Sequence, residues 1–401
     1  MCYLQFECLR PSYQGAVLDA ASVHFRPSIT KTDILVLLLF RYCSEECRKQ
    51  SWETYHNVEC RYLDLLLQSC IGAMAHLTVK LLAVTGLARV LKCRRNPKSS
   101  SEALCQSLSI NSSGVYIGGY VSLYSLLSHS ESRSPAELFQ YTLLAVWLTD
   151  LLYRTAFAVC GSSDDSERAM VGGVVLRFLQ IVTCNGVEVT ELQLTDTLHR
   201  SHPVSVGLAL YPTVSLLNHA CDPVLELVFY GDRCVVRAVQ NARAGRELLI
   251  DYGQVYYLAG RAERRAALRH QYHFDCQCVA CSLDWPLKAH LPSGAATLKC
   301  VGCGAALGPN QLAADPVECG LCRREQTGLA DRLDVLATSQ AAAEKAIGDA
   351  RKFRVTKSTM SALEEHLTLI DKYIQLPWKD YVVCLSTLKQ CYRYLGNHRQ
   401  S

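Results

Sequence analysis

Three cysteines near position 280 carry the most specific chemical signal in this chain. In the sequence DCQCVAC, Cys276, Cys278 and Cys281 form a C-x-C-x-x-C arrangement. Three thiols so close together cannot all pair with one another, but their thiolates can occupy three corners of a tetrahedron around a zinc ion. The segment has no fourth ligand, so the chain must bring one from elsewhere, and Cys221 in the turn-like sequence NHACDP is the best candidate. The pattern predicts a zinc site, and the alternative is a thiol-rich turn.

A second group of cysteines follows shortly after the first. Cys300 and Cys303 form one C-x-x-C pair, and Cys319 and Cys322 form another after fifteen intervening residues. This spacing is typical of a zinc ribbon, in which each pair offers two thiolates on a tight turn. Glycines in or beside each pair permit the backbone shape of such turns. A redox C-x-x-C is the alternative, but no βαβ pattern surrounds either pair.

The third candidate metal segment is YCSEECRKQSWETYHNVEC, near the N-terminus. Cys43, Cys47, His56 and Cys60 have a spacing that allows one zinc site with three cysteines and one histidine. The same residues also fit two halves of two different sites. A third possibility is a helical hairpin whose cysteines are buried without metal.

The cysteine count is high for a chain without a secretory signal. The sequence holds 21 cysteines. Glu7 and Asp19 interrupt the N-terminal region, and no basic segment there leads into a long apolar one. We therefore expect an intracellular protein, cytoplasmic and nuclear. Because reducing compartments disfavour disulfides, clustered thiols are expected to be metal ligands.

Composition argues against two classes of partner. The formal net charge of +4 is too small to indicate a nucleic-acid or anionic-membrane partner. The longest aliphatic run, 34–40, is far shorter than a membrane-spanning helix, which needs about 20 residues. A nucleic-acid reader at the second cysteine group is also disfavoured, because only Lys299, Arg323 and Arg324 lie nearby. We expect neither a membrane nor a nucleic acid as partner.

The elements that must position these residues follow from hydrophobic periodicity. Apolar residues recur at steps of three and four in 63–91 and 138–159, which predicts helices. The period then changes, because 225–239 contains two strand-like runs and 247–252 a third.

Helical patterns return after these strands. Residues 261–272 have a helical period with a basic face that we expect to be solvated. The arginines of this face are Arg261, Arg264, Arg265 and Arg269. Beyond Thr327, three helical patterns resemble the beginning of a helix-repeat tail.

Four segments together resemble the SET and MYND domain-containing protein lysine methyltransferases. In chain order they are YCSEECRKQSW..YH..EC, SLLNHACDP, ELLIDYG and FDCQCVAC. The resemblance covers residues 42–281 and is weaker in the tail. It implies an α+β protein with a SET-domain β-fold, a helical insert, a zinc-bound post-SET segment, a partial MYND zinc finger and an α-helical repeat-like C-terminal tail.

The resemblance also implies a division of the chain into parts. They are an unassigned, non-family N-terminus at 1–41, a partial MYND finger at 42–60, a helical insert at 61–170, a SET core at 171–253, a post-SET zinc segment at 254–282, a zinc-ribbon-like segment at 296–325 and a helical tail at 326–401.

Residue roles follow from the same resemblance. Tyr252 matches the catalytic tyrosine, which also contacts the methyl donor S-adenosylmethionine (SAM). The other residues at positions that contact SAM in the family are Asn218, His219, Asn185 and Phe274. Cys221 and the three cysteines of DCQCVAC match the post-SET zinc ligands, in agreement with the site inferred from their spacing.

The chemistry of methyl transfer suits these residue types. A lysine amine has an ordinary pKa near 10.4, so it must lose a proton before it attacks a methyl group. An aromatic channel desolvates the ammonium, which lowers that pKa, and its ring faces attract the methylated cation by about 0.5 to 2 kcal/mol. We expect Tyr252 to line such a channel and the substrate to be a protein that presents a lysine.

The chain departs from the family pattern at three places. The family's MYND module has two further C-x-x-C pairs before the YCS sequence, and they are absent here, so each of its two zinc sites would keep only two ligands. Residues 1–41 lack the glycine-rich turn that cradles SAM, which an N-terminal truncation would explain. Val224 stands where the motif ends in asparagine, and we expect lower stability there rather than a changed reaction.

The sequence therefore predicts a SAM-dependent protein-lysine N-methyltransferase that acts on a histone or non-histone protein. The rival hypothesis is a catalytically impaired, zinc-rich scaffold that recruits protein partners through its MYND finger and helical tail. We predict two zinc ions per chain, one in the post-SET segment and one in the ribbon.

Overall fold

The computed structural model describes residues 2–5, 44–60, 62–68, 72–95, 113, 116, 118–157, 164–231, 233–242, 244–294, 296–308 and 316–400. The chain divides into two compact units. Unit 1 comprises residues up to 190 together with 205–216, and unit 2 comprises 191–204 together with the chain from 217 onward.

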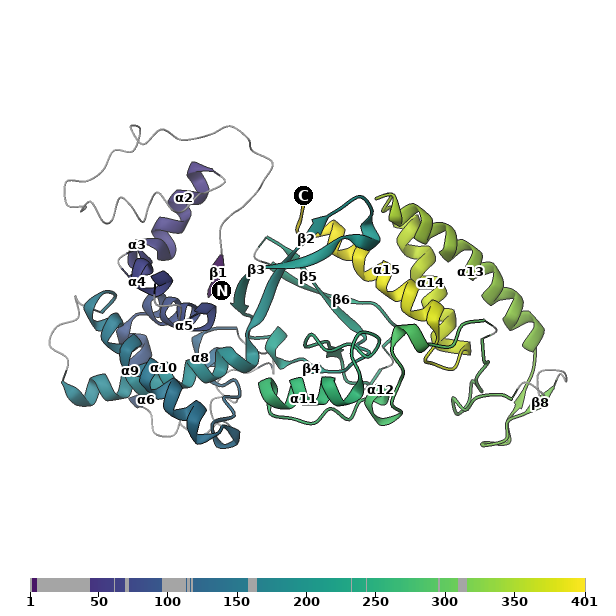
Figure 1. The fold of residues 1–401 in the computed structure, drawn as a ribbon, viewed down its shortest axis with the longest axis horizontal. Coiled ribbons are helices and arrows are strands. Elements are labelled where there is room, and N and C mark those ends of the chain that lie inside the picture. The colour runs from purple at the N-terminus through teal and green to yellow at the C-terminus, as the bar shows by residue number, and fades with distance from the viewer. Residues whose placement is uncertain are drawn as a thin grey trace. The chain divides into compact units, whose positions relative to one another are not determined.

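Unit 1 is mostly helical (Figure 1). Helix α10 (Asp165–Asn185) is its centre and packs against α5 (Gly72–Thr85), α6 (Leu87–Arg95) and α9 (Pro135–Arg154). Its shorter helical segments are α2 (Glu45–Ser51), the π-helical turn η2 (Trp52–His56), α3 (Asn57–Glu59), α4 (Leu63–Gln68), α8 (Tyr120–Tyr124), η4 (Ser130–Ser132) and η7 (Val214–Leu216). The predicted limit of the helical insert at residue 170 falls inside α10.

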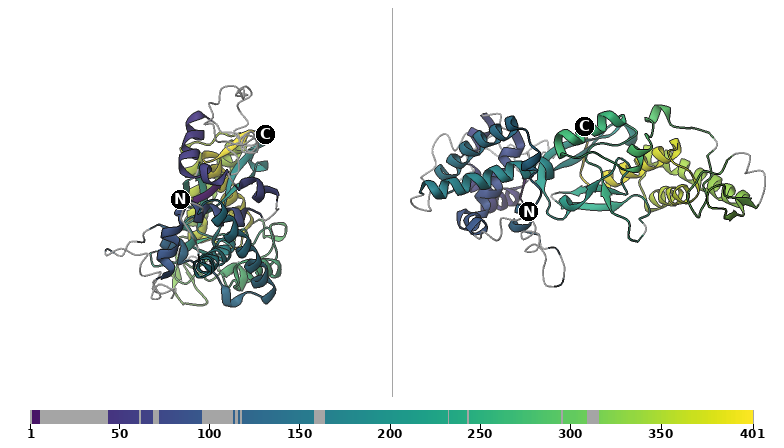
Figure 2. Two further views of the ribbon diagram at one scale, coloured as in Figure 1. Left: turned by 90° about the vertical axis from the view of Figure 1, so that its left-hand side faces the viewer. Right: turned by 90° about the horizontal axis from the view of Figure 1, so that it is seen from below.

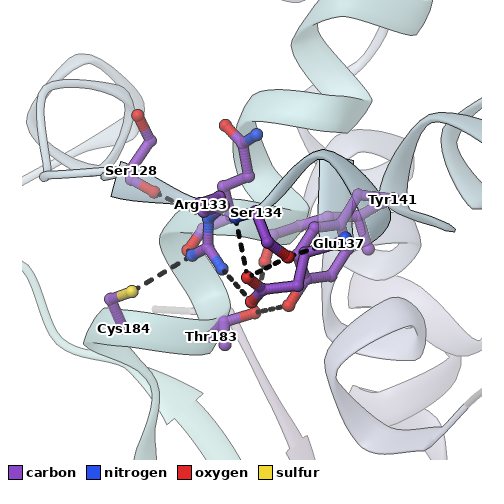
Figure 3. Close-up of polar contacts among 9 residues, drawn as sticks. Ser128, Arg133, Ser134, Glu137, Tyr141, Thr183 and Cys184 are labelled. Atoms are coloured by element: carbon purple, nitrogen blue, oxygen red, sulfur yellow. Dashed lines mark hydrogen bonds and ion pairs between the residues drawn. The ribbon is translucent and has the colours of Figure 1, made fainter. Parts of the chain in front are cut away.

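A polar cluster fixes the start of α9 (Figure 3). Ser134 Oγ accepts from the Glu137 N–H at 3.2 Å, and the Glu137 carboxylate accepts from the Ser134 N–H at 3.0 Å, which is a capping box. The buried Arg133 beside it donates to the Gln180 carbonyl at 3.1 Å and to Cys184 Sγ at 3.2 Å. Both acceptors lie on α10, so this arginine connects the start of α9 to the central helix.

Strands β2 (Val187–Leu194) and β3 (His202–Leu210) contribute residues to both units. They are the central strands of a four-stranded sheet with the order β1-β3-β2-β10. In unit 1, β1 (Cys2–Gln5) pairs antiparallel with β3. In unit 2, β10 (His398–Gln400) pairs parallel with β2, so the end of the described chain returns to this sheet.

Two small sheets in unit 2 carry the candidate site. Strands β5 (Leu225–Tyr230) and β6 (Arg233–Ala238) form an antiparallel hairpin, which confirms the two strand-like runs predicted at 225–239. Strands β4 (Asn218–His219) and β7 (Leu249–Ile250) pair in parallel. The remaining elements before the tail are η6 (Leu198–Arg200), α11 (Arg261–Tyr272), α12 (Val279–Ser282), η8 (Lys288–His290), β8 (Val317–Glu318) and β9 (Glu325–Gln326).

Three long helices form the C-terminal part of unit 2, as the sequence pattern predicts. They are α13 (Leu329–Arg351), α14 (Lys357–Tyr373) and α15 (Lys379–Leu395). Helices α13 and α14 lie side by side (Figures 1 and 2). Helix α15 contacts β5, where the buried Lys389 Nζ lies 3.0 Å from the buried Glu226 Oε2. Within the described ranges, none of the helices combines the length and the apolar character that a bilayer crossing requires.

Candidate active site and metal centres

The four cysteines that the sequence pattern assigns to one zinc site lie together in unit 2. Cys221 follows β4, Cys276 and Cys278 follow α11, and Cys281 lies in α12. Their sulfur atoms all lie within 4.8 Å of one another. Cys221 Sγ is 3.5 Å from Cys281 Sγ and 3.9 Å from Cys276 Sγ. Because four thiolates bound to zinc at about 2.3 Å have sulfurs about 3.8 Å apart, this group has dimensions that suit a tetrahedral zinc site.

Three of the four cysteines of this first cluster are buried, and contacts among the sulfurs shift their pKa values in opposite directions. Cys221 and Cys281 have no exposed surface, and Cys276 is almost as buried. Hydrogen bonds with Cys221 and Cys276 hold the pKa of Cys278 well below its ordinary value, whereas contacts with Cys276 and Cys278 raise the pKa of Cys221. Four such thiols cannot all be anionic without a cation among them, and zinc supplies that charge where it binds.

The second group of cysteines also converges. Cys300 Sγ lies 3.6 Å from Cys322 Sγ, and Cys303 Sγ lies 3.6 Å from Cys319 Sγ. All four sulfurs fall within 4.8 Å of one another. The first pair sits on a tight turn in which the Gly302 N–H donates to Cys300 Sγ at 3.3 Å, and the second lies between the short paired strands β8 and β9. This group, too, could hold a metal ion.

The third candidate segment is only partly described. Cys43 lies outside the described residues, and the position of the Cys47 side chain is not among them either. His56 is the last residue of η2, and Cys60 is the first residue after α3. The Nδ1 atom of His56 lies 3.6 Å from Glu59 Oε2. Among the residues that the structure describes, only the other two cysteine groups have metal-binding geometry. A zinc site in this segment remains a prediction.

Pairing between β4 and β7 brings together two motifs that are distant in the sequence. Asn218 lies opposite Leu249 and His219 lies opposite Ile250 in the parallel register. Tyr252 is the second residue after β7, and its backbone N–H reaches the side chain of His219 and donates to Nδ1 at 3.0 Å. The NHAC and IDYG sequences therefore form one local structure.

An aromatic cluster surrounds Tyr252. Its ring centroid lies 4.6 Å from that of Tyr272, 5.3 Å from that of His219 and 6.4 Å from that of Phe274. The Tyr272 and Phe274 side chains come from the end of α11 and the residues just after it. Four rings from three sequence segments thus meet at one place, and three of them are the predicted residues Tyr252, His219 and Phe274.

The hydroxyl group of Tyr252 is fixed by the backbone. It donates to the Leu217 carbonyl at 2.6 Å. Burial and the nearby Glu247 charge raise the pKa of Tyr252 to about 12, so the hydroxyl stays protonated at neutral pH. This tyrosine can orient a substrate and offer an oxygen lone pair, but it is not a base at neutral pH.

His219 connects the aromatic cluster with the first cysteine cluster. Because its Nδ1 accepts from the Tyr252 N–H, the ring proton of the neutral imidazole belongs on Nε2. Nε2 lies 3.4 Å from Cys221 Sγ and is oriented to donate to it. Burial lowers the pKa of His219, which favours this neutral form. One side chain therefore joins a candidate metal ligand to the backbone of Tyr252.

The two asparagines lie in different units. Asn218 is exposed in unit 2, and its Nδ2 donates to Glu247 Oε1 at 2.7 Å. Asn185 ends α10 in unit 1, and its amide donates to the Leu127 carbonyl at 2.8 Å and to the Ile181 carbonyl at 2.9 Å. Both amides have partners within the protein, and a role in binding SAM remains a prediction for each.

Tyr272 is a site residue that the motifs did not single out. It is the ring nearest to Tyr252 in the cluster, yet it lies two residues before Phe274 and outside the cysteine motif. The available signal was its place at the last position of α11, immediately before the residues that turn toward the cysteines. An aromatic residue at such a junction is expected to pack over the turn after the helix.

The expectation that Arg264 belongs to a solvated face is wrong. Its side chain is fully buried, at 0% exposure. Nε lies 3.2 Å from Cys221 Sγ and Nη2 lies 3.4 Å from Cys281 Sγ. Arg264 and Leu268 are one helical turn apart and share the buried face of α11. The four-residue spacing from Leu268 indicated that position 264 is buried, but the charge of arginine favoured an exposed position instead.

Comparison with known proteins agrees with the motifs. The SET domain family matches residues 29–253, so the match begins inside the N-terminal segment 1–41, to which no family part was assigned. Protein-lysine N-methyltransferase SMYD4 of Pongo abelii is 28% identical over 369 residues, covering 80% of this chain and 46% of that protein. The SMYD4 of Homo sapiens is 28% identical over 358 residues, covering 77% and 44%.

A second kind of relative matches over a shorter range. Histone-lysine N-methyltransferase SMYD3 of Mus musculus is 29% identical over 241 residues, covering 60% of this chain and 46% of that protein. The matched part is thus less than half the length of each of these curated relatives. The family resemblance carried by the four motifs is confirmed.

Proposed function

This chain belongs to the SET-domain family, among the SET and MYND domain-containing proteins, and on that premise we propose that it is a SAM-dependent protein-lysine N-methyltransferase. The observation that carries the proposal is the position of Tyr252. Its hydroxyl is fixed to the Leu217 carbonyl, inside a cluster of aromatic rings and one residue from a strand that pairs with the NHAC segment.

The residues around Tyr252 suit an amine acceptor. A lysine ammonium among the Tyr252, Tyr272 and Phe274 rings would lose part of its hydration, which lowers its pKa toward neutrality and favours the free amine. The ring faces also tolerate a methylated cation. Because in-line transfer needs alignment more than acid or base catalysis, a hydroxyl whose direction is fixed by a short hydrogen bond contributes by positioning.

The methyl donor would bind beside the same cluster. SAM, when bound, supplies an electrophilic methyl group on a sulfonium. The residue types fit that group, because Phe274 and Tyr252 offer ring faces to a cation and Asn218 offers an exposed amide to its polar end. We assign SAM binding to Asn218, His219, Phe274 and Tyr252, whereas a role for Asn185, which belongs to the other unit, rests on the family resemblance alone.

We propose zinc as a structural component of both cysteine groups. Four sulfur ligands complete a tetrahedral shell and leave no open position, so these metals would not take part in the reaction. In the first cluster, the metal would fix Cys221 and, through His219, the backbone of Tyr252. Zinc would then act on the active site through rigidity alone.

The other assignments are also proposals. The substrate would be a protein with an accessible lysine, and the helical tail and MYND segment would contact protein partners. The described cysteines of the two four-cysteine groups are free thiols, which suits a reducing compartment, and we propose a cytoplasmic and nuclear location. Imaging of a fluorescently tagged full-length protein in living cells would test this location.

A scaffold without activity is the second candidate. It is favoured by one observation, namely that the Asn185 amide is already bonded to the Leu127 and Ile181 carbonyls. A scaffold needs the zinc sites and the helical tail but not SAM, so calorimetric titration with SAM separates the two functions.

Transfer of tritium from labelled SAM to protein lysine tests the proposed function. We expect transfer by the zinc-loaded chain to fall at least about a hundredfold in Tyr252→Phe, because the fixed hydroxyl is lost while the ring remains. Tyr230→Phe is the matched control, since its hydroxyl lies on β5, away from the Tyr252 cluster, and accepts from Arg237 at 3.5 Å. Equal transfer by wild type and Tyr252→Phe, or absence of SAM binding, would favour the scaffold.

A further inference from the structure

Arg264 is a cation buried without a carboxylate. Within the described residues, no acidic side chain lies within ion-pair distance of it. Its guanidinium instead donates to two backbone carbonyls, those of Ala259 at 2.5 Å and Tyr256 at 3.5 Å, and to the sulfurs of Cys221 and Cys281. Because a guanidinium is always charged in proteins, burial requires an anion nearby. Among the residues that the structure describes, the candidates in contact are these two sulfurs.

A second buried arginine, Arg133, shows how the charge of a buried guanidinium is ordinarily balanced. Arg133 in unit 1 also touches a cysteine, Cys184, but the Glu137 carboxylate lies 3.6 Å from its guanidinium and the Tyr141 ring lies under it (Figure 3). That arginine has its countercharge without any thiolate. Within the described part of the chain, Arg264 has no carboxylate in that role, and its guanidinium instead faces the sulfur atoms of Cys221 and Cys281.

Charge balance at the first cysteine cluster leads to the same conclusion. Four thiolates around one divalent cation leave two negative charges uncompensated. Burying that excess in a site without water is costly unless a cation or hydrogen-bond donors accompany it. The guanidinium supplies one positive charge and two N–H donors, directed at two of the four ligands. In the described part of the ribbon, by contrast, sulfur contacts are with backbone N–H groups and other sulfurs.

We propose that Arg264 is the counter-cation of the post-SET metal centre and determines how tightly that centre retains zinc. This inference rests on the zinc sites of the proposed function and not on methyl transfer. Arg264 is a positioning residue in this role, since it acts through the sulfur atoms of Cys221 and Cys281. Its contacts predict a strengthened post-SET site and no effect on the ribbon.

Zinc transfer to a chromophoric chelator tests this proposal on the full chain. Wild type should release two equivalents in two phases. In Arg264→Met, which keeps the bulk of the side chain but not its charge, we expect the post-SET equivalent to bind about 10- to 100-fold more weakly, as is usual when a group bonded to a metal ligand is removed. The ribbon equivalent should be unchanged. Arg133→Met is the matched control and should alter neither phase.

A spectroscopic measurement separates this role from a merely structural one. In a Cys303→Ser background, cobalt occupies only the post-SET site, and Arg264→Lys keeps the charge but loses the forked N–H donors. Fewer hydrogen bonds to thiolate raise the energy of the sulfur electrons, so the sulfur-to-cobalt charge-transfer band should move to longer wavelength. Arg133→Lys should leave the band in place.

Failure of the proposal for Arg264 and failure of the proposed zinc site give different results. Unchanged zinc affinity in Arg264→Met, or, should that variant fail to fold, an unshifted cobalt band in Arg264→Lys, would overturn the proposal for Arg264. Absence of metal at Cys221, Cys276, Cys278 and Cys281 in wild type would instead overturn the zinc site of the proposed function, and the proposal for Arg264 with it.

Discussion

The two four-cysteine groups of unit 2 have the same ligands and similar dimensions, yet their surroundings differ. In the first cluster (Cys221, Cys276, Cys278 and Cys281), which we propose as the post-SET zinc site and call the post-SET group, three of the four cysteines are buried. A guanidinium contacts two of the sulfurs, and His219 joins one to Tyr252. In the ribbon group, Cys303 is exposed, Cys322 is half-buried, and the knuckle residues Val301 and Leu321 are 50% and 73% exposed. The first group is enclosed in the core, whereas the second has two buried ligands, Cys300 and Cys319, and two that reach the surface.

The groups also differ in the length of chain that they close. The post-SET ligands come from Cys221 and from Cys276 onward, so a metal there joins two distant segments that flank the ELLIDYG motif. The ribbon ligands span only Cys300 to Cys322. Because a longer loop costs more entropy to close, the post-SET metal should matter more for folding. The comparison suggests that metals with the same ligands can serve the active site in one place and only local structure in another.

Cys221→Ser should have the largest effect. Loss of one ligand should release the post-SET zinc, leave Arg264 buried beside an uncharged group, and free His219 from its sulfur partner. We expect a loss of several kcal/mol out of the about 5 to 15 kcal/mol that stabilise an ordinary domain. Metal analysis should fall from two zinc ions to one, and SAM binding should vanish. Retention of two zinc ions would contradict the assignment of Cys221.

Cys303→Ser should have a smaller and more local effect. It removes an exposed ligand of the ribbon, so metal analysis should again show one zinc ion. Because the post-SET group does not contact this cysteine, the melting temperature should change by less than about 4 °C, which corresponds to about 1 kcal/mol for a domain of this size. A fall as large as that in Cys221→Ser would show that the two groups fold as one.

Tyr381→Phe tests whether the helical tail stabilises the post-SET group but not the ribbon. The Tyr381 hydroxyl donates to both carboxylate oxygens of Asp222 at 3.0 Å, next to Cys221. Removing a donor from this half-buried carboxylate should cost about 1 kcal/mol. We expect faster zinc release from the post-SET group and an unchanged ribbon in the chelator assay. Tyr392→Phe is the matched control, because its hydroxyl contacts Glu364 at 2.6 Å within the tail. Equal release in both variants would argue against this coupling.

The order of thiol modification should show the smallest difference. During slow chelation in the presence of iodoacetamide, alkylation should reach Cys303 and Cys322 before Cys276 and Cys281, because the latter pair is buried. Peptide mass spectrometry at successive times measures this order. Simultaneous modification of both groups would mean that their exposures do not govern metal release.

Sequence reasoning located much of this fold because local patterns agreed with tertiary structure. The helical period at 261–272 coincides with α11, and the two strand-like runs became β5 and β6 around Gly231, whose φ of 60° suits glycine. Helix α9 begins a little before its predicted start because Ser134 and Pro135 form its cap. Such details depend on single residues at helix ends rather than on periodicity.

The metal ligands of the candidate site could be predicted, because their spacing along the chain indicates a metal site. The residues that join the site through burial could not be predicted in this way. The C-x-C-x-x-C pattern supplies three thiols for one metal, and Cys221 was the best candidate in the sequence for the fourth. Arg264 was misjudged because a charged residue is ordinarily exposed, and the contacts that bury its guanidinium against Cys221 and Cys281 come from distant parts of the chain. Tyr272 lies outside the motifs, so its contact with Tyr252 could be recognised only once the path of the chain after α11 was known.

The central claim is that closure of the post-SET cysteines holds Tyr252 in place for methyl transfer. Methyl transfer from labelled SAM to protein lysine, compared between Cys221→Ser and Cys303→Ser, tests it most directly. We predict that transfer is abolished in Cys221→Ser and remains near the wild-type rate in Cys303→Ser. Equal loss in both variants, or full activity in Cys221→Ser, would contradict the account.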